Sequence, residues 1–175
     1  LGDLEVADDG TLWVATRTRL YSLAEGGKLR LVGGAQRGPA PELDGKPASE
    51  AGFGPGTRNP LTIHRDGDGT TLLAYDHALA HLDAEGKLEV LWRGDADDAV
   101  AGIIPLADGK HQLLVRSGSD PATARYAWWS ARPGAASIRL RAASEAEAGV
   151  LRAGAGEAHR LPAGGQGPLG VAQGG

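Results

Sequence analysis

The chain has 175 residues and a mass of 17.9 kDa, which corresponds to about one domain with a single hydrophobic core. Hydrophobic residues make up 41% and charged residues 23%, proportions that exclude wholesale disorder and a fibrous protein. Because cysteine is absent, disulfides, thiolate catalysis and cysteine zinc sites are excluded. The net charge of -4 argues against a nucleic-acid partner, and no apolar run is long enough to span a bilayer.

Internal repetition is the strongest signal in the sequence. Asp9-Gly10-Thr11 opens a stretch that matches Asp68-Gly69-Thr70, and residues 20–32 then align without a gap with residues 79–91. Each copy contains short stretches of alternating apolar residues, which are interrupted by turn-forming dipeptides. Such a pattern predicts several short antiparallel strands in each copy.

The first copy predicts four strands, at about residues 3–8, 11–16, 19–24 and 28–32. The second predicts strands at about 61–65, 70–75, 79–83 and 87–92, and the third copy runs from about 100 to 140. Gly10, Gly69 and Gly109 occupy equivalent turns, where we expect a positive φ. Helical periodicity is nearly absent, and only residues 142–148 predict a helical turn or two.

Two motifs resemble known propeller families. Asp44-Gly45-Lys46-Pro47-Ala48, preceded by Val32-Gly33-Gly34, resembles the V-x-G and D-G-x-P-A-x-x-A elements of NHL-repeat propellers. Residues 9–16, with Leu20-Tyr21 after them, are similar to the blade signature of regulator propellers in bacterial sensor proteins. The resemblance implies an all-β fold, namely a β-propeller segment of four-stranded antiparallel blades. It also implies that the D-G-x-P-A loop links the outer strand of one blade to the inner strand of the next.

We therefore expect a single partial propeller domain over residues 1–175. Its expected parts are blade one at 1–34, an inter-blade loop at 35–59, blade two at 60–94, blade three at 99–142, and a linker with the first strand of a fourth blade at 143–175. A propeller closes with about four to eight blades, so the ring is incomplete in this chain. We expect additional blades from another chain or from the rest of a longer chain, and the first residue, Leu1, favours a processed or excised piece.

The loops of one face carry the expected binding site. In propellers, the connections between blades share a face with the loops between second and third strands, and function usually lies on loops held by a rigid scaffold. Arg and Tyr are favoured there because they combine contact area with directed hydrogen bonds. The candidate residues for binding a protein partner are Arg17, Arg19, Arg37, Arg58, Tyr75, His77 and Arg116.

Catalytic candidates are few. His77 and His81 have the spacing of two metal ligands, but no H-E-x-x-H glutamate stands between them. Residues 66–69, Asp-Gly-Asp-Gly, are better explained as a hairpin turn than as a calcium loop, because His77 occupies the place of the bidentate glutamate. No G-x-S-x-G motif or phosphate loop is present. The sequence therefore assigns no catalytic residue, metal or cofactor.

A non-catalytic binding module is the interpretation that these observations favour. Two alternatives stay open at this point, a calcium-dependent lactonase- or lyase-type propeller enzyme and a carbohydrate-binding propeller. The second depends on Trp128-Trp129, which would stack on sugars from an exposed strand. Trp13 aligns with Leu72 and is expected to fill the space between adjacent blades.

Overall fold

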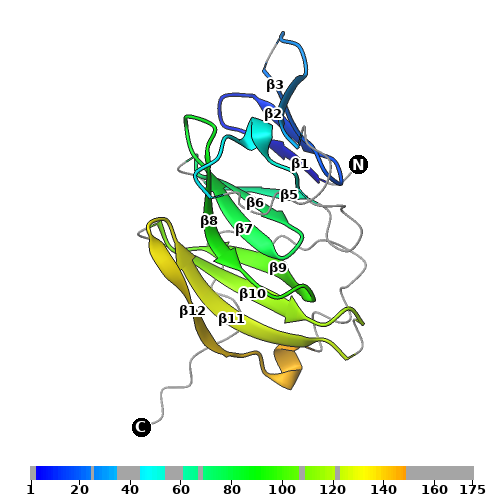
Figure 1. The fold of residues 1–175 in the computed structure, drawn as a ribbon, viewed down its shortest axis with the longest axis vertical. Helices are drawn as coiled ribbons and strands as arrows, with labels where there is room; N and C mark the ends of the chain where they lie inside the picture. Colours follow the sequence, from blue (N-terminus) through cyan, green and yellow to red (C-terminus); the bar gives the residue numbers. More distant parts are fainter. Residues whose placement is uncertain are drawn as a thin grey trace.

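Three four-stranded antiparallel sheets stack side by side in the computed structural model of the protein (Figure 1). The structure describes residues 3–24, 26–34, 44–53, 61–66, 69–106, 109–120 and 123–148. The first strand that we expect of a fourth blade lies outside these ranges. Within each sheet the strands follow one another in chain order, so each strand pairs with the next one along the chain. The prediction of an all-β propeller segment built from four-stranded blades is confirmed.

The strands lie close to their predicted positions. Blade one contains β1 (Asp3–Val6), β2 (Leu12–Ala15), β3 (Leu20–Leu23) and β4 (Arg30–Gly33). Blade two contains β5 (Thr62–Arg65), β6 (Thr71–Tyr75), β7 (Ala78–Leu82) and β8 (Leu88–Arg93). Blade three contains the longer strands β9 (Asp98–Pro105), β10 (His111–Ser117), β11 (Arg125–Arg132) and β12 (Ala135–Ala142).

The equivalent hairpin turns have the backbone conformation that the repeat predicts. Gly10, Gly69 and Gly109 have φ values of +80°, +89° and +68°, a region that glycine enters without the steric cost that a Cβ imposes. In the first turn, the Thr11 N–H donates to Asp9 Oδ1 at 2.9 Å, and this bond lowers the pKa of the Asp9 carboxyl. The Asp-Gly pair therefore supplies both the conformation and the local hydrogen bond of the turn.

Burial on both faces is the main feature of blade two. All five residues of β6 are buried, and successive side chains of a strand point to opposite faces. Leu73 and Tyr75 belong to the core shared with blade one, whereas Leu72 and Ala74 belong to the core shared with blade three. Blade two is thus held between its two neighbours (Figure 1).

Aromatic residues fill the spaces between blades. Trp13 packs against the core between blades one and two, which confirms its predicted place. Trp92 is 1% exposed in the core between blades two and three, and its ring meets Trp129 edge to face at a centroid distance of 6.1 Å. Large rings of this kind contribute much of the apolar area that holds adjacent sheets together.

The described part of the inter-blade loop, residues 44–53, lies along β8. The Leu88 N–H donates to the Lys46 carbonyl and the Ala48 N–H donates to the Gly86 carbonyl, both at 2.8 Å. The 3-10 helix η1 (Ala48–Glu50) follows. This part of the loop therefore satisfies the free edge of an outer strand. The resemblance to NHL-repeat propellers stays a prediction.

A short helical turn at residues 145–148, which the sequence predicts, packs on the far side of blade three. Ser144 and Glu147 form reciprocal bonds between side chain and backbone N–H, the arrangement of a capping box. Arg141 forms two hydrogen bonds to the Glu147 carboxylate, at 2.8 and 2.6 Å, and Trp128 Nε1 donates to the same group at 3.3 Å. In the described part of the chain, no helix is long and apolar enough to cross a membrane.

The Glu147 carboxylate makes this cap sensitive to acid. Hydrogen bonds from Arg141 and from the Ser144 N–H hold the pKa of Glu147 far below its ordinary value of 4.5. A depressed pKa stabilises the fold above the unfolded-state pKa, and the stabilisation is lost as the pH falls. We expect Glu147→Gln to be less stable than the parent chain at pH 7, with the difference shrinking below about pH 4.5.

Urea unfolding at several pH values measures this difference. Glu85→Gln removes an exposed carboxylate elsewhere and serves as the control. A stability difference for Glu147→Gln that stays constant down to pH 3 would contradict the assignment.

Candidate functional site

The loops between second and third strands and the connections between blades come together at one face. The Leu61 N–H donates to the Arg17 carbonyl at 3.3 Å, the Gly94 N–H to the His77 carbonyl at 2.9 Å, and the Gly118 N–H to the Asp97 carbonyl at 3.0 Å. We call residues 16–19, 75–78, 93–98 and 117–120 the loop face. The hairpin turns that contain Gly10, Gly69, Gly86 and Gly109 form the opposite face, called the turn face.

The structure places four of the predicted binding residues on or beside the loop face with some exposure. Arg17 and Arg19 are exposed on the loop of blade one. His77 is partly buried on the loop of blade two, and its Nδ1 lies 3.3 Å from Asp76 Oδ2. Arg116 is partly buried near the end of β10. The other two arginines, Arg37 and Arg58, lie outside the described residues.

Tyr75 is a core residue, so the expectation that it is an exposed binding residue of the loops is wrong. Its side chain is 5% exposed and meets the Phe53 ring edge to face at 5.1 Å. Burial raises the pKa of its hydroxyl well above the ordinary value. The reason is the architecture, because a strand in the middle of a blade between two neighbours buries both of its faces.

A pocket of about 540 Å³ opens beside the connection from blade two to blade three. Residues of the connection form one side of it, and strands of blade three form the other. The lining residues are Asp95, Ala96, Asp97, Asp98, Ser117, Ala127, Trp129 and Arg139. The pocket is thus a concave part of the loop face, built on the ends and outer strands of a rigid sheet.

The pocket combines an aromatic ring with an excess of negative charge. Three aspartates and one arginine line it, and Trp129 is partly exposed there. Asp98 Oδ2 accepts a hydrogen bond from the Asp95 N–H at 3.0 Å, which fixes one carboxylate against the connection. The Trp92 ring packs edge to face against the Trp129 ring. The ring and the Asp98 carboxylate are therefore positioned before any ligand arrives.

The two adjacent tryptophans do not form an exposed stacking surface. Trp128 is buried against the helical turn on the far side of blade three, and only Trp129 reaches the pocket. The expectation of an exposed strand at Trp128-Trp129 is wrong, because the helical turn covers Trp128 on one face of β11 and blade two packs against Trp129 on the other. Successive residues of this strand face opposite sides, so the pair cannot contact one ligand surface together.

A second polar cluster joins blades two and three toward the turn face. The Asp66 carboxylate lies between two imidazoles, with Oδ1 at 2.8 Å from His64 Nε2 and Oδ2 at 2.7 Å from His111 Nε2. His64 comes from β5 and His111 from β10, so one carboxylate bridges two blades. The imidazole of His111 is 1% exposed, and its Nδ1 is buried with no hydrogen-bond partner.

The two imidazoles of this cluster differ in their exposure to solvent. The His64 side chain is 24% exposed, so it could present its other nitrogen to a ligand, whereas His111 is completely covered. A carboxylate that holds one nitrogen of an imidazole fixes its tautomer and orientation. Over the ranges that the structure describes, no group of three or more His, Asp or Glu side chains is arranged to hold a metal ion.

Sequence reasoning missed both of these features. Ala7, at the position of Asp66 in the first copy, and Leu106, at that position in the third, show that Asp66 departs from the repeat. That departure was the signal available for the cluster. For the pocket, the signal was the acidic run at residues 95–98 in a connection between blades.

The comparisons with known proteins add little beyond the fold. No protein-family model matches the sequence, and no curated protein matches it. Among solved structures, the chain is similar to virginiamycin B lyase from Staphylococcus aureus, with 11% sequence identity and a TM-score of 0.44. The match covers 82% of this chain and 56% of that protein, so the chain spans little more than half of its length. At this identity and TM-score, the similarity says nothing about activity.

Proposed function

We propose that the protein is a binding module that receives a basic side chain of a protein partner in the loop-face pocket. The observation that carries the proposal is the placement of Trp129 beside three aspartates in a preformed hollow. An ammonium or guanidinium group over an indole face gains electrostatic attraction from the ring, and indole is the strongest of the aromatic rings in this respect. The carboxylates add charge complementarity, which sets specificity and speeds association.

The rest of the loop face would form the rim of the interface. Arg17, Arg19 and His77 lie on the same face and could meet polar or acidic groups of the partner. Rim charges usually contribute less than a central, well-packed anchor, so the pocket is the proposed centre of the binding energy.

Two pentapeptides that differ only at the central residue, lysine in one and norleucine in the other, test the pocket. We expect the lysine peptide to bind and to shift the indole N–H resonance of Trp129 in NMR spectra at low ionic strength, while the norleucine peptide does not. The double variant Asp95→Asn/Asp97→Asn should weaken binding of the lysine peptide about tenfold, or about 1.4 kcal/mol. Its expected cause is the loss of two of the three lining carboxylates.

Matched variants separate the pocket from a general charge effect. Glu85→Gln removes an exposed carboxylate next to the Gly86 turn, on the opposite face, and should leave the affinity unchanged. Arg17→Ala and His77→Ala probe the rim, with an expected loss of at least about 1 kcal/mol for a larger partner that covers the whole face. Equal binding of the two peptides, or an affinity that falls only with Glu85→Gln, would overturn the proposal.

A further inference from the structure

Blade one has an apolar face that no described residue covers. Cross-strand pairing places Leu4, Val14, Tyr21 and Leu31 in one row across the four strands of the blade, with Val6, Leu12 and Leu23 in a parallel row. We call this surface the outward face. Leu4 is 46% exposed, Val6 68% and Leu31 45%. Contiguous apolar patches of this kind mark interaction sites.

The repeat identifies what the outward face is built to contact. The register that aligns Leu20 with Leu79 also aligns Leu4, Val14 and Leu23 with Ile63, Leu73 and Leu82. In blade two these three residues are buried in the core shared with blade one. These residues of the outward face are therefore the equivalents of residues that, in blade two, pack against the preceding blade.

The outward face of blade one is hollowed at the position where, in blade two, the tryptophan of the preceding blade packs. In blade two, the Arg65 guanidinium lies 5.8 Å from the centre of the Trp13 ring, which blade one contributes. Arg65 pairs across the strands with Thr71, and the equivalents of these residues in blade one are Val6 and Leu12.

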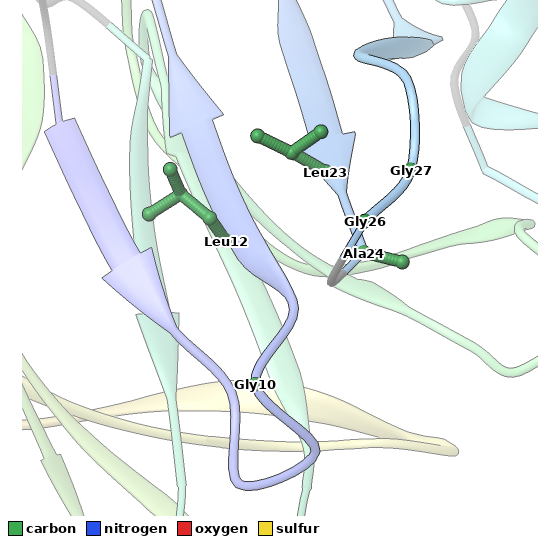
Figure 2. A pocket seen from close by; sticks show the side chains of 6 residues that line it. All are labelled: Gly10, Leu12, Leu23, Ala24, Gly26 and Gly27. Carbon is green, nitrogen blue, oxygen red and sulfur yellow. The ribbon is translucent and has the colours of Figure 1, made fainter.

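At this end of blade one the surface is hollowed by about 280 Å³, lined by Leu12, Leu23 and the glycine turns (Figure 2). Figure 2 shows the two leucine side chains projecting from adjacent strands at the rim of the hollow. The hollow thus lies where an aromatic ring of a preceding blade would lie.

At the opposite end of the stack of blades, a helical turn lies against blade three. The helical turn covers part of the far side of blade three, with Ala148 buried against Trp128 and Tyr126, while Ile138 on β12 stays 64% exposed. The ion pair between Arg141 and Glu147 holds this cover in place. A second copy would therefore have to displace the turn before it could present the whole far side of its blade three to the outward face.

We infer that the outward face of blade one is an inter-blade interface, and that its occupant is a further four-stranded antiparallel blade with a large aromatic residue at the position equivalent to Trp13. The aromatic ring enters the hollow beside Leu12 and Leu23. Around it, small and branched apolar residues meet Leu4, Val14 and Leu31, as Ala15 and Leu20 of blade one meet blade two.

An extended chain tests this inference with the protein's own blade as the probe. Residues 3–61, which contain blade one and the connection to blade two, are repeated ahead of Asp3. The added blade then presents its own copies of Trp13, Ala15 and Leu20 to the outward face. We expect the extended chain to melt at a higher temperature than the present chain and to bind less of an apolar dye such as anilinonaphthalene sulfonate.

Paired substitutions show whether the contact is specific. Leu31→Glu in the original blade one should change the melting temperature of the present chain by less than 2 °C and lower that of the extended chain by at least about 5 °C. Replacing Trp by Ala at the copy of position 13 in the added blade should have a similar effect on the extended chain. These two substitutions lower the melting temperature of the extended chain only if the added blade covers the outward face.

Three results would overturn the inference. One is the same effect of Leu31→Glu in both chains. Another is an extended chain that does not fold, since residues 35–61 already join two packed blades. The third is concentration-dependent dimerisation of the present chain in sedimentation experiments that Leu31→Glu abolishes, because the occupant would then be a second copy.

Discussion

Trp92→Ala is expected to lower the free energy of unfolding by about 3–5 kcal/mol. The Trp92 side chain is 1% exposed, and it lies between Leu79 and Leu91 of its own blade and Trp129 of blade three. Removing the ring leaves a cavity at the junction of two blades. Both sheets are rigid, so the cavity collapses only in part, and lost dispersion contacts add to the lost burial.

Urea unfolding followed by circular dichroism measures this loss. Trp92→Phe should cost less, because the smaller ring still fills much of the space and the buried indole N–H, which has no hydrogen-bond partner, is removed. Leu140→Ala, at a site that is 48% exposed on β12, should stay within about 0.5 kcal/mol of the parent chain. A cost for Trp92→Ala no larger than that of Leu140→Ala would show that blades two and three do not pack through this ring.

Asp66→Ala should destabilise the protein by about 3 kcal/mol, since the carboxylate is the shared acceptor of two imidazoles. The larger part of the loss comes from His111. Its Nδ1 already has no partner, so removing Asp66 leaves both ring nitrogens unpaired in the interior. A buried polar group without a partner carries its full desolvation cost.

Asp66→Asn provides the matched variant, because the amide keeps one acceptor oxygen and replaces the other with a donor. One of the two imidazoles can still donate to it, and the other must change tautomer, so we expect about half of the loss. Asp8→Ala, on the exposed turn of blade one, should have little effect. If the thermal and urea stability of Asp66→Ala equals that of Asp8→Ala, the cluster does not join the blades.

The repeat made the fold predictable. Alternating apolar residues and Asp-Gly turns indicated all the strands of blades one and two, and the positive φ values at Gly10 and Gly69 followed from the turn type. These properties depend on residues close together in the sequence. Blade three was less regular in sequence, and its strands are longer than the repeat suggested.

The site was harder to predict because its parts come from different blades. Asp66 and His111 are far apart in the sequence and occupy positions where the other copies have different residues, so no repeat pattern links them. Tyr75 was expected to anchor a partner because it stands at the loop between the second and third strands and Tyr is favoured at interfaces, but its strand is covered on both sides. Whether a residue at a strand end faces solvent or the next blade depends on packing between sheets, which a single sequence does not show.

The complete burial of β6 determines how the protein loses its structure. A blade that exposed one face could unfold alone, but blade two contributes more than half of the buried residues in each of the two inter-blade cores. Local opening of its strands therefore breaks both cores at once and costs nearly the whole free energy of unfolding. In a repeat protein whose neighbour contacts dominate the stability of each unit, the units unfold together. We therefore expect the three blades to unfold together in one cooperative transition.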